Sequence, residues 1–228
     1  MRRDIRKRAF AHNIRPECDL RDWRRDRRWD QQTLNASADY ATHMTNTPSV
    51  TAAGNLVIRA AGEADARVLS AFASAAFNTT FGPDSDPADI DAYVAYAFGP
   101  ERQAAEIADP DRTCLLLVDG SHVVGYAMLR RDPGESEPRQ TRSIELQRFY
   151  VDRAWHGRGV AARLMEACLR LAGEQQAATI WLGVWERNPR AIRFYAKQGF
   201  VDVGSQEFRL GSDLQTDRVM SRSVAEPT

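Results

Sequence analysis

The 228-residue sequence has no long apolar run and few cysteines. No stretch approaches the roughly 18 consecutive apolar residues that a membrane-spanning helix needs, and the arginine-rich N-terminus lacks the apolar core of a secretory signal. The hydrophobic fraction of 43% and the charged fraction of 27% argue against wholesale disorder and against a fibrous repeat. We therefore expect a cytoplasmic protein with a substantial hydrophobic core and no membrane partner.

The three cysteines have neither metal-type nor redox-type spacing, and an odd number cannot form a complete disulfide framework. Cys168 falls beside Met165 and Leu169 in a helical pattern, where a thiol behaves as a small apolar side chain. The sequence also lacks a His/Cys/Asp ligand cluster, which predicts chemistry without a metal. The formal net charge of +0 indicates no class of partner.

The first 53 residues differ from the rest, because arginines crowd together there without hydrophobic periodicity. We interpret residues 1–53 as a disordered leader before a domain over residues 54–228. Arginines interleaved with Trp23 and Trp29 would suit nucleic acid, but interspersed aspartates dilute the positive field and disfavour this function. An alternative is that translation starts at Met44, which would remove most of the leader.

From residue 54 onward, hydrophobic patterning predicts a mixed α/β domain with a central sheet. The expected order of elements is βααβββαβαββ, and the Pro- and Gly-rich segment 131–141 is expected to be a loop. The predicted strands cover residues 56–58, 114–118, 122–129, 144–151, 179–184, 200–203 and 218–221, and the predicted helices cover 63–77, a segment starting near 89, 159–172 and 189–197.

A predicted strand runs into a turn containing Gly157 and Gly159 and then into a helix. The first amides of a helix have no internal acceptor, and the helix dipole places about half a positive charge there. Glycines let those amides approach a pyrophosphate closely, and Arg153, Arg158 and Arg163 add positive charge. The pattern favours an anion site, although a lone GxG is also explained by a tight turn alone.

Two other nucleotide sites fit this turn less well. No Lys-Ser or Lys-Thr pair follows the glycines, as the phosphate loop of ATPases requires. The strand over residues 179–184 does not end in the acidic residue that a dinucleotide-binding fold places about twenty residues after its glycines. Both alternatives are therefore disfavoured.

Residues 188–200 follow the pattern N-x-x-A-x-x-F-Y-x-K-x-G-F. Together with the preceding strand and the x-x-G-x-G/A turn, this pattern resembles the GNAT superfamily of acetyl-CoA-dependent N-acetyltransferases over about residues 55–224. The resemblance implies a mixed sheet with splayed central strands, acetyl-CoA as co-substrate, and acyl transfer to a primary amine without a metal.

The resemblance also implies roles for individual residues. Phe149, Tyr150 and Val151 would bind the pantetheine arm through unpaired backbone groups of the fourth strand, as an added strand would. Asn188 would hydrogen-bond the pantetheine, and Tyr195 would protonate the departing coenzyme A thiolate, unless it is simply a core aromatic. The pyrophosphate would bind the turn made by His156, Gly157, Arg158, Gly159, Val160, Ala161 and Ala162.

Two positions depart from the family's pattern. His156 stands where Gln or Arg is usual, which we expect to weaken the anchoring of the cofactor without abolishing it. Gly183 occupies the fifth-strand position where some members of the family carry a Glu that acts as the general base. Glu145 matches the position of a fourth-strand Glu used by others, and strand alternation predicts that it shares a face with Gln147 and Phe149. Glu145 is therefore the candidate general base, with substrate binding as its alternative role.

Within the superfamily, three stretches of the chain resemble the PaiA-type polyamine acetyltransferases, namely residues 145–151, 182–188 and 210–217. Asp84, Asp86 and Asp89 lie between the first two predicted helices, where a polycation would be attracted, although helix capping also explains them. A protein N-terminal or lysine acetyltransferase and a non-catalytic acyl-CoA-binding regulator are the alternative functions. The sequence leaves the acceptor and the oligomeric state open.

Overall fold

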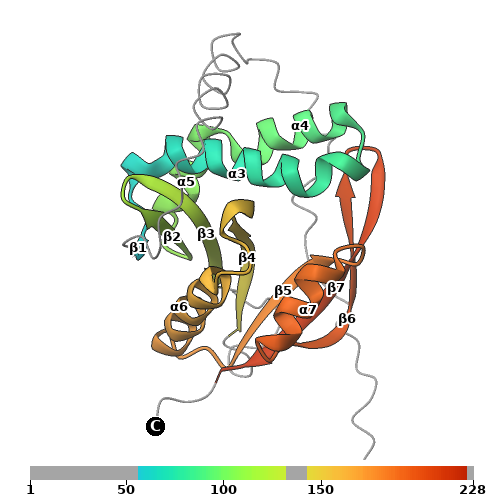
Figure 1. The fold of residues 1–228 in the computed structure, drawn as a ribbon. Helices are drawn as coiled ribbons and strands as arrows, with labels where there is room; N and C mark the ends of the chain where they lie inside the picture. The colour runs from blue at the N-terminus through green and yellow to red at the C-terminus, as the bar shows by residue number, and fades with distance from the viewer. Residues whose placement is uncertain (1–55, 132–142, 225–228) are drawn as a thin grey trace, which may run out of the picture.

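The computed structural model describes residues 56–131 and 143–224 (Figure 1). The predicted leader over residues 1–53, together with Cys18 and Met44, lies outside the described residues, as does the predicted loop from residue 132 onward. The structure is a mixed α/β domain, as the sequence predicts.

The described part of the chain contains one α-helix more than predicted. Helix α5 is only nine residues long and buries two polar side chains, Gln103 and Glu106, so its low apolar content gives a weak helix signal. Among the described residues, no helix is long and apolar enough to cross a lipid bilayer. The α-helices are α3 (Ala66–Phe81), α4 (Pro87–Phe98), α5 (Pro100–Ala108), α6 (Val160–Glu174) and α7 (Pro189–Lys197).

The described strands form one mixed sheet in the order β1-β2-β3-β4-β5-β7-β6. Strands β6 and β7 pair as a hairpin much longer than the two short strands predicted. In β6 only Leu210 is buried, and half of the residues are polar, so the sequence gives a weak strand signal. The strands are β1 (Leu56–Ala60), β2 (Arg112–Asp119), β3 (His122–Arg131), β4 (Ser143–Val151), β5 (Thr179–Trp185), β6 (Val201–Leu210) and β7 (Asp213–Ser223).

The sheet carries a hydrophobic core on each face (Figure 1). Helices α3, α4 and α5 cover one face, where Phe72, Phe98 and Tyr126 are nearly inaccessible to solvent. Helices α6 and α7 cover the other face. Cys114 and Cys168 are buried in these two cores with free thiols, and burial raises the pKa of each to about 12, so both act as apolar packing groups.

Strands β4 and β5 run parallel but pair over only three positions, from Ser143 with Thr179 to Glu145 with Trp181. Beyond these pairs the two strands diverge, while β4 stays paired with β3 as far as Val151. The backbone of residues 146–151 therefore has no strand partner on its β5 side. This divergence confirms the expected splay of the central strands.

A β-bulge in β4 keeps Glu145 and Gln147 on one face, as predicted, but moves Phe149 to the other face. Gln147 has no partner on β3 because the register between β3 and β4 shifts there. The extra residue reverses the faces of the strand beyond it. Glu145 consequently pairs with Arg130 on the face beneath α3, whereas Phe149 stacks on Phe194 of α7 on the other face.

Candidate functional site

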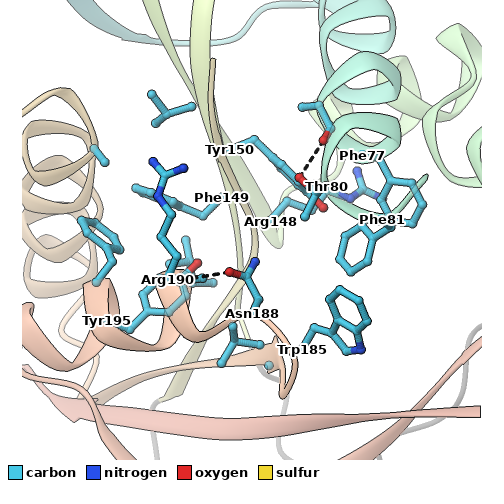
Figure 2. A pocket seen from close by; sticks show the side chains of 18 of the residues that line it. Phe77, Thr80, Phe81, Arg148, Phe149, Tyr150, Trp185, Asn188, Arg190 and Tyr195 are labelled. Atoms are coloured by element: carbon cyan, nitrogen blue, oxygen red, sulfur yellow. Dashed lines mark hydrogen bonds between the residues drawn. The ribbon is translucent and has the colours of Figure 1, made fainter. Parts of the chain in front are cut away.

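A cavity of about 1310 Å³ opens where β4 and β5 diverge. Its walls come from both layers of helices (Figure 2). Phe77 and Phe81 of α3 line one side and Tyr195 of α7 lines the other, with Tyr150 of β4 between them. The volume exceeds the roughly 300–1,000 Å³ of most ligand sites, so the cavity has room for two reactants.

The turn between β4 and α6 presents unpaired backbone donors to this cavity. The N–H groups of residues 157–162 donate to no backbone carbonyl among the residues described. Gly157 and Gly159 have φ angles of +76° and +75°, and a Cβ at either position would meet nothing within 4 Å. This open space beside free amides at the start of a long helix is the geometry that a pyrophosphate site requires.

The arginines near the turn have different roles. Arg153 lines the cavity, and so does Arg190 of α7, which the sequence did not single out. Arg158 lies 5.7 Å from the centre of the Trp155 ring, and Arg163 donates to a backbone carbonyl of β1 at 2.8 Å. Arg153 and Arg190 are therefore the guanidinium groups placed to add charge to the anion site.

His156 fastens the turn to the end of β4. Its Nε2 donates to the Val151 carbonyl at 2.9 Å, while its Nδ1 is buried and has no partner among the described residues. Burial lowers the pKa of His156, so the imidazole is neutral at pH 7 with its proton on Nε2. The side chain thereby stabilises the geometry of the turn and leaves the anion to the backbone amides.

Phe149, Tyr150 and Val151 line the cavity at the splayed end of β4. Phe149 stacks on Phe194 with ring centres 5.6 Å apart, and Tyr150 stacks on Tyr126 at the same distance. The two rings pack on opposite faces of the sheet and hold the strand rigid. The backbone edge of residues 146–151 has no partner on its β5 side, so it is available to pair with an extended ligand.

Tyr195 and Asn188 come from the two ends of α7. Tyr195 is 8% exposed, packs edge-to-face on Phe149, and lines the cavity. Burial raises the pKa of its phenol well above the ordinary value, so the hydroxyl is protonated at pH 7 and can donate. Asn188 accepts a hydrogen bond from Ala191 N at 3.0 Å through its Oδ1 and caps the helix, which leaves its amide N–H groups for the cavity.

Glu145 lines the cavity but is engaged in an ion pair. Arg130 Nη2 lies 2.8 Å from its Oε2, and Arg130 Nε donates to the same oxygen at 2.9 Å. An ion pair of this kind commits the carboxylate oxygen to a fixed guanidinium partner. The geometry favours a positioning or binding role for Glu145 over that of a base.

The predicted aspartate cluster separates into three different environments. Asp84 lines the cavity. Asp86 is the N-cap of α4 and accepts from Ala88 N at 2.8 Å. Asp89 accepts from both the backbone N and the hydroxyl of Ser212, in the turn between β6 and β7. Of the three, only Asp84 faces the space where an acceptor would bind.

Besides Arg190, two further features of the cavity were missed by sequence reasoning. Arg148 of β4 is nearly buried, forms an ion pair with Glu106 of α5, and lies over the Phe98 ring at 4.9 Å. Asp217 of β7 also lines the cavity. Neither belongs to a local pattern, because each depends on the pairing of segments that are distant in sequence.

Comparison with known proteins gives a consistent result. The sequence model of the Acetyltransferase (GNAT) family matches residues 75–200, more than half of the chain. An uncharacterized N-acetyltransferase of Mycobacterium tuberculosis is 38% identical over 160 residues, covering 70% of this chain and 98% of that protein. A spermine/spermidine N(1)-acetyltransferase of Bacillus subtilis is 31% identical over 87 residues, covering 38% of this chain and 57% of that protein.

A solved structure shares the fold. The PaiA N-acetyltransferase of Thermoplasma acidophilum, crystallised with coenzyme A, superposes with a TM-score of 0.63 at 18% identity, covering 74% of this chain and 99% of that one. The family match extends over the strand, the turn and the α7 segment that build the cavity. The chain therefore belongs to the GNAT family of acetyltransferases.

Proposed function

We propose that this N-acetyltransferase carries the acetyl group of acetyl-CoA to a primary amine of a small polycation such as a polyamine. The observation that carries the donor half of the proposal is the row of free amides at residues 157–162, which faces a cavity where β4 has an unpaired edge. The pyrophosphate would bind these amides with Arg153 and Arg190, and the pantetheine arm would pair with residues 149–151 and with Asn188.

Bound acetyl-CoA supplies an activated thioester, and the residues around it control protons and orientation. Tyr195 holds a proton at its phenol oxygen, because burial keeps its pKa high, and it would give that proton to the departing sulfur. A backbone N–H near Val151 would stabilise negative charge that develops on the carbonyl oxygen. Phe81 and Trp185, whose ring centres lie 5.5 Å apart, form an aromatic wall of the cavity.

We call the part of the cavity lined by Asp84, Trp185, Glu207 and Asp217 the acceptor end. The charge of this part supports a cationic substrate. Besides the Glu145–Arg130 pair, four further carboxylates line the cavity. Asp152 caps the turn after β4, whereas Asp84, Glu207 and Asp217 lie outside that turn.

The carboxylates of the acceptor end come from the segment after α3, from β6 and from β7, and Arg187 and Arg209 line the same cavity. Asp217 is paired on the sheet with Trp185, which lies across the pocket from Arg190 (Figure 2). A flexible polyamine can place one ammonium group at the thioester and others against these carboxylates. The partial likeness to the spermine/spermidine acetyltransferase of Bacillus subtilis agrees with this substrate class.

The test is a thiol-release assay with acetyl-CoA against spermidine, spermine, single amino acids, and peptides with free N-termini or lysines. We expect turnover with the polyamines and a KM that rises on Asp84→Asn. Mass spectrometry of the product should show one added acetyl group on a primary nitrogen. If only peptides are acetylated, the acceptor is a protein and not a polyamine. If no amine is acetylated although coenzyme A binds tightly, the protein is an acyl-CoA-binding regulator.

A further inference from the structure

Asp217 holds a carboxylate in the middle of the acceptor end of the cavity. On the sheet it lies directly between Trp185 of β5 and Gln206 of β6. Its Oδ2 lies 3.1 Å from the point that a Cβ at Gly183 would occupy. Because position 183 has no side chain, the Asp217 carboxylate reaches the cavity from β7.

The surroundings of Asp217 differ from those of Glu145. Among the described residues, no hydrogen bond or ion pair engages the Asp217 side chain, whereas Glu145 is paired with Arg130 at 2.8 Å. The neighbouring Gln206 has a buried Oε1 that also lacks a partner within the described part of the chain. Gln206 Nε2 lies 2.7 Å from the same Cβ point at Gly183, so this place holds one amide donor beside the Asp217 carboxylate and the Gln206 Oε1. These two acceptor groups suit a ligand that brings its own N–H groups.

We propose that Asp217 is the general base that removes a proton from the ammonium group of the acceptor. This inference rests on the proposed function and identifies which carboxylate of the cavity performs the first proton transfer. Glu145 and the ion-paired Arg130 then form a wall of the site rather than part of the proton path.

The reaction balances with the groups at hand. The acceptor ammonium transfers one proton to Asp217, which later releases it to solvent, and the neutral amine attacks the thioester carbonyl. The new C–N bond forms, the C–S bond breaks, and the electron pair of that bond leaves with the sulfur. The second proton of the nitrogen ends on the sulfur, because Tyr195 donates its phenolic proton there and is reprotonated from the nitrogen through water.

Burial, with a smaller contribution from the charge of Glu186, raises the pKa of Asp217 to about 6. A general base whose pKa lies near neutral pH accepts a proton readily and is still ionised at the working pH. Below pH 6 the carboxylate is protonated and cannot act, so the rate should rise with pH through this value. The other titratable or charged side chains that line the same cavity near it are Asp84 after α3, Glu145 and Tyr150 on β4, Arg187 after β5, and Glu207 and Arg209 on β6.

The experiment compares Asp217→Asn, Asp217→Glu and Glu145→Gln with the parent protein, using acetyl-CoA and spermidine over pH 5 to 9. Asp202→Asn is the matched control, because Asp202 lies on the same hairpin in an exposed ion pair with Arg218 at 2.7 Å. We expect Asp217→Asn to lower kcat/KM by roughly 100-fold or more and to abolish the acid limb centred near pH 6. Asp217→Glu should retain that limb, and Asp202→Asn should match the parent within about twofold.

The thermal midpoint of each variant separates catalysis from folding. Asp217→Asn should melt at the same temperature as the parent or higher, since it removes a half-buried charge that has no partner among the described residues. The inference is overturned if Asp217→Asn keeps the acid limb and the parental rate, or if Glu145→Gln loses the limb instead. If the parent protein acetylates none of the amines, the proposed function itself is overturned. The Asp202→Asn control would then be inactive as well.

Discussion

The two ends of the cavity are built in different ways. At the donor end, consecutive residues 157–162 present backbone amides, and the shape of the turn is set by Gly157 and Gly159. At the acceptor end, the lining side chains, such as Asp84, Trp185 and Asp217, belong to elements that are distant in sequence. The comparison shows that a site for a common cofactor can be encoded in one segment, whereas a site for a particular acceptor depends on how distant segments pack.

Among the substitutions that test this comparison, we expect the largest loss of activity at Tyr195, which lies between the donor end and the acceptor end of the cavity. Tyr195→Phe keeps the packing on Phe149 but removes the proton donor, so kcat should fall by roughly 100-fold while the KM for acetyl-CoA stays nearly constant. Steady-state kinetics measures both. Tyr126→Phe is the control, because it removes a buried hydroxyl outside the cavity, and equal losses in the two variants would contradict the role of Tyr195.

The second effect concerns stability at the acceptor end. The pKa of Asp217 is raised from 3.8 to about 6, so between these values the folded protein binds more protons than the unfolded chain. The stability that protonation of Asp217 gives the fold is complete below pH 3.8 and is lost as pH rises through about 6. Asp217→Asn should remove this dependence and raise the free energy of unfolding at pH 7 by up to about 3 kcal/mol.

Urea denaturation at pH 4, 5, 6 and 7 measures that dependence. A variant that is less stable than the parent at pH 7 would show that the carboxylate is a structural partner. That result would contradict the view that the acceptor end is built from reactive side chains while the donor end is built from backbone amides.

The third effect belongs to the donor end. In Gly159→Ala, the new Cβ enters the open space beside the amides and the residue must keep a φ of +75°, so the KM for acetyl-CoA should rise by about tenfold. Gly120→Ala is a matched control, since Gly120 has a φ of +59° and equally free space but lies in the turn between β2 and β3. Both variants should lose about 1 kcal/mol of stability. A similar rise in KM for both would argue against the anion site.

The smallest effect separates capping from substrate binding. Asp86→Ala removes the N-cap of α4 and should cost about 1 kcal/mol of unfolding free energy with an unchanged KM for spermidine. Asp84→Asn should do the reverse, raising the KM with little change in stability. Thermal unfolding and kinetics on the same preparations check both, and a raised KM in Asp86→Ala would restore that residue to the acceptor site.

Much of the donor end could be predicted from the sequence because its signals are local. Glycine at 157 and 159, the apolar helix that follows, and the pattern from Asn188 to Phe200 locate the turn and α7 within a few residues. The mixed sheet and its splayed strands are confirmed as well. The roles given to His156 and Asn188 needed coordinates, since each side chain makes a local hydrogen bond that residue type alone does not specify.

The acceptor end could not be predicted in the same way. The bulge at Gln147 reverses the faces of β4, and a one-residue shift of this kind leaves no clear mark in the alternation of a strand whose two faces are both partly buried. Asp217 acquires its position from pairing with Trp185 and Gln206, which are 32 and 11 residues away in sequence. Its significance follows from the missing side chain at Gly183, whose place is taken by Gln206 Nε2 and Asp217 Oδ2, and no local pattern reveals this.

The central claim is that free backbone amides at the start of α6 bind a diphosphate while the open edge of β4 receives the attached thioester arm. Isothermal titration calorimetry of the protein with coenzyme A, and separately with pantetheine, tests it most directly. We predict saturable binding of coenzyme A at one site per chain, and binding of pantetheine weaker by roughly 100-fold because it lacks the diphosphate. Absence of heat with coenzyme A, or equal affinity for the two ligands, would contradict the account.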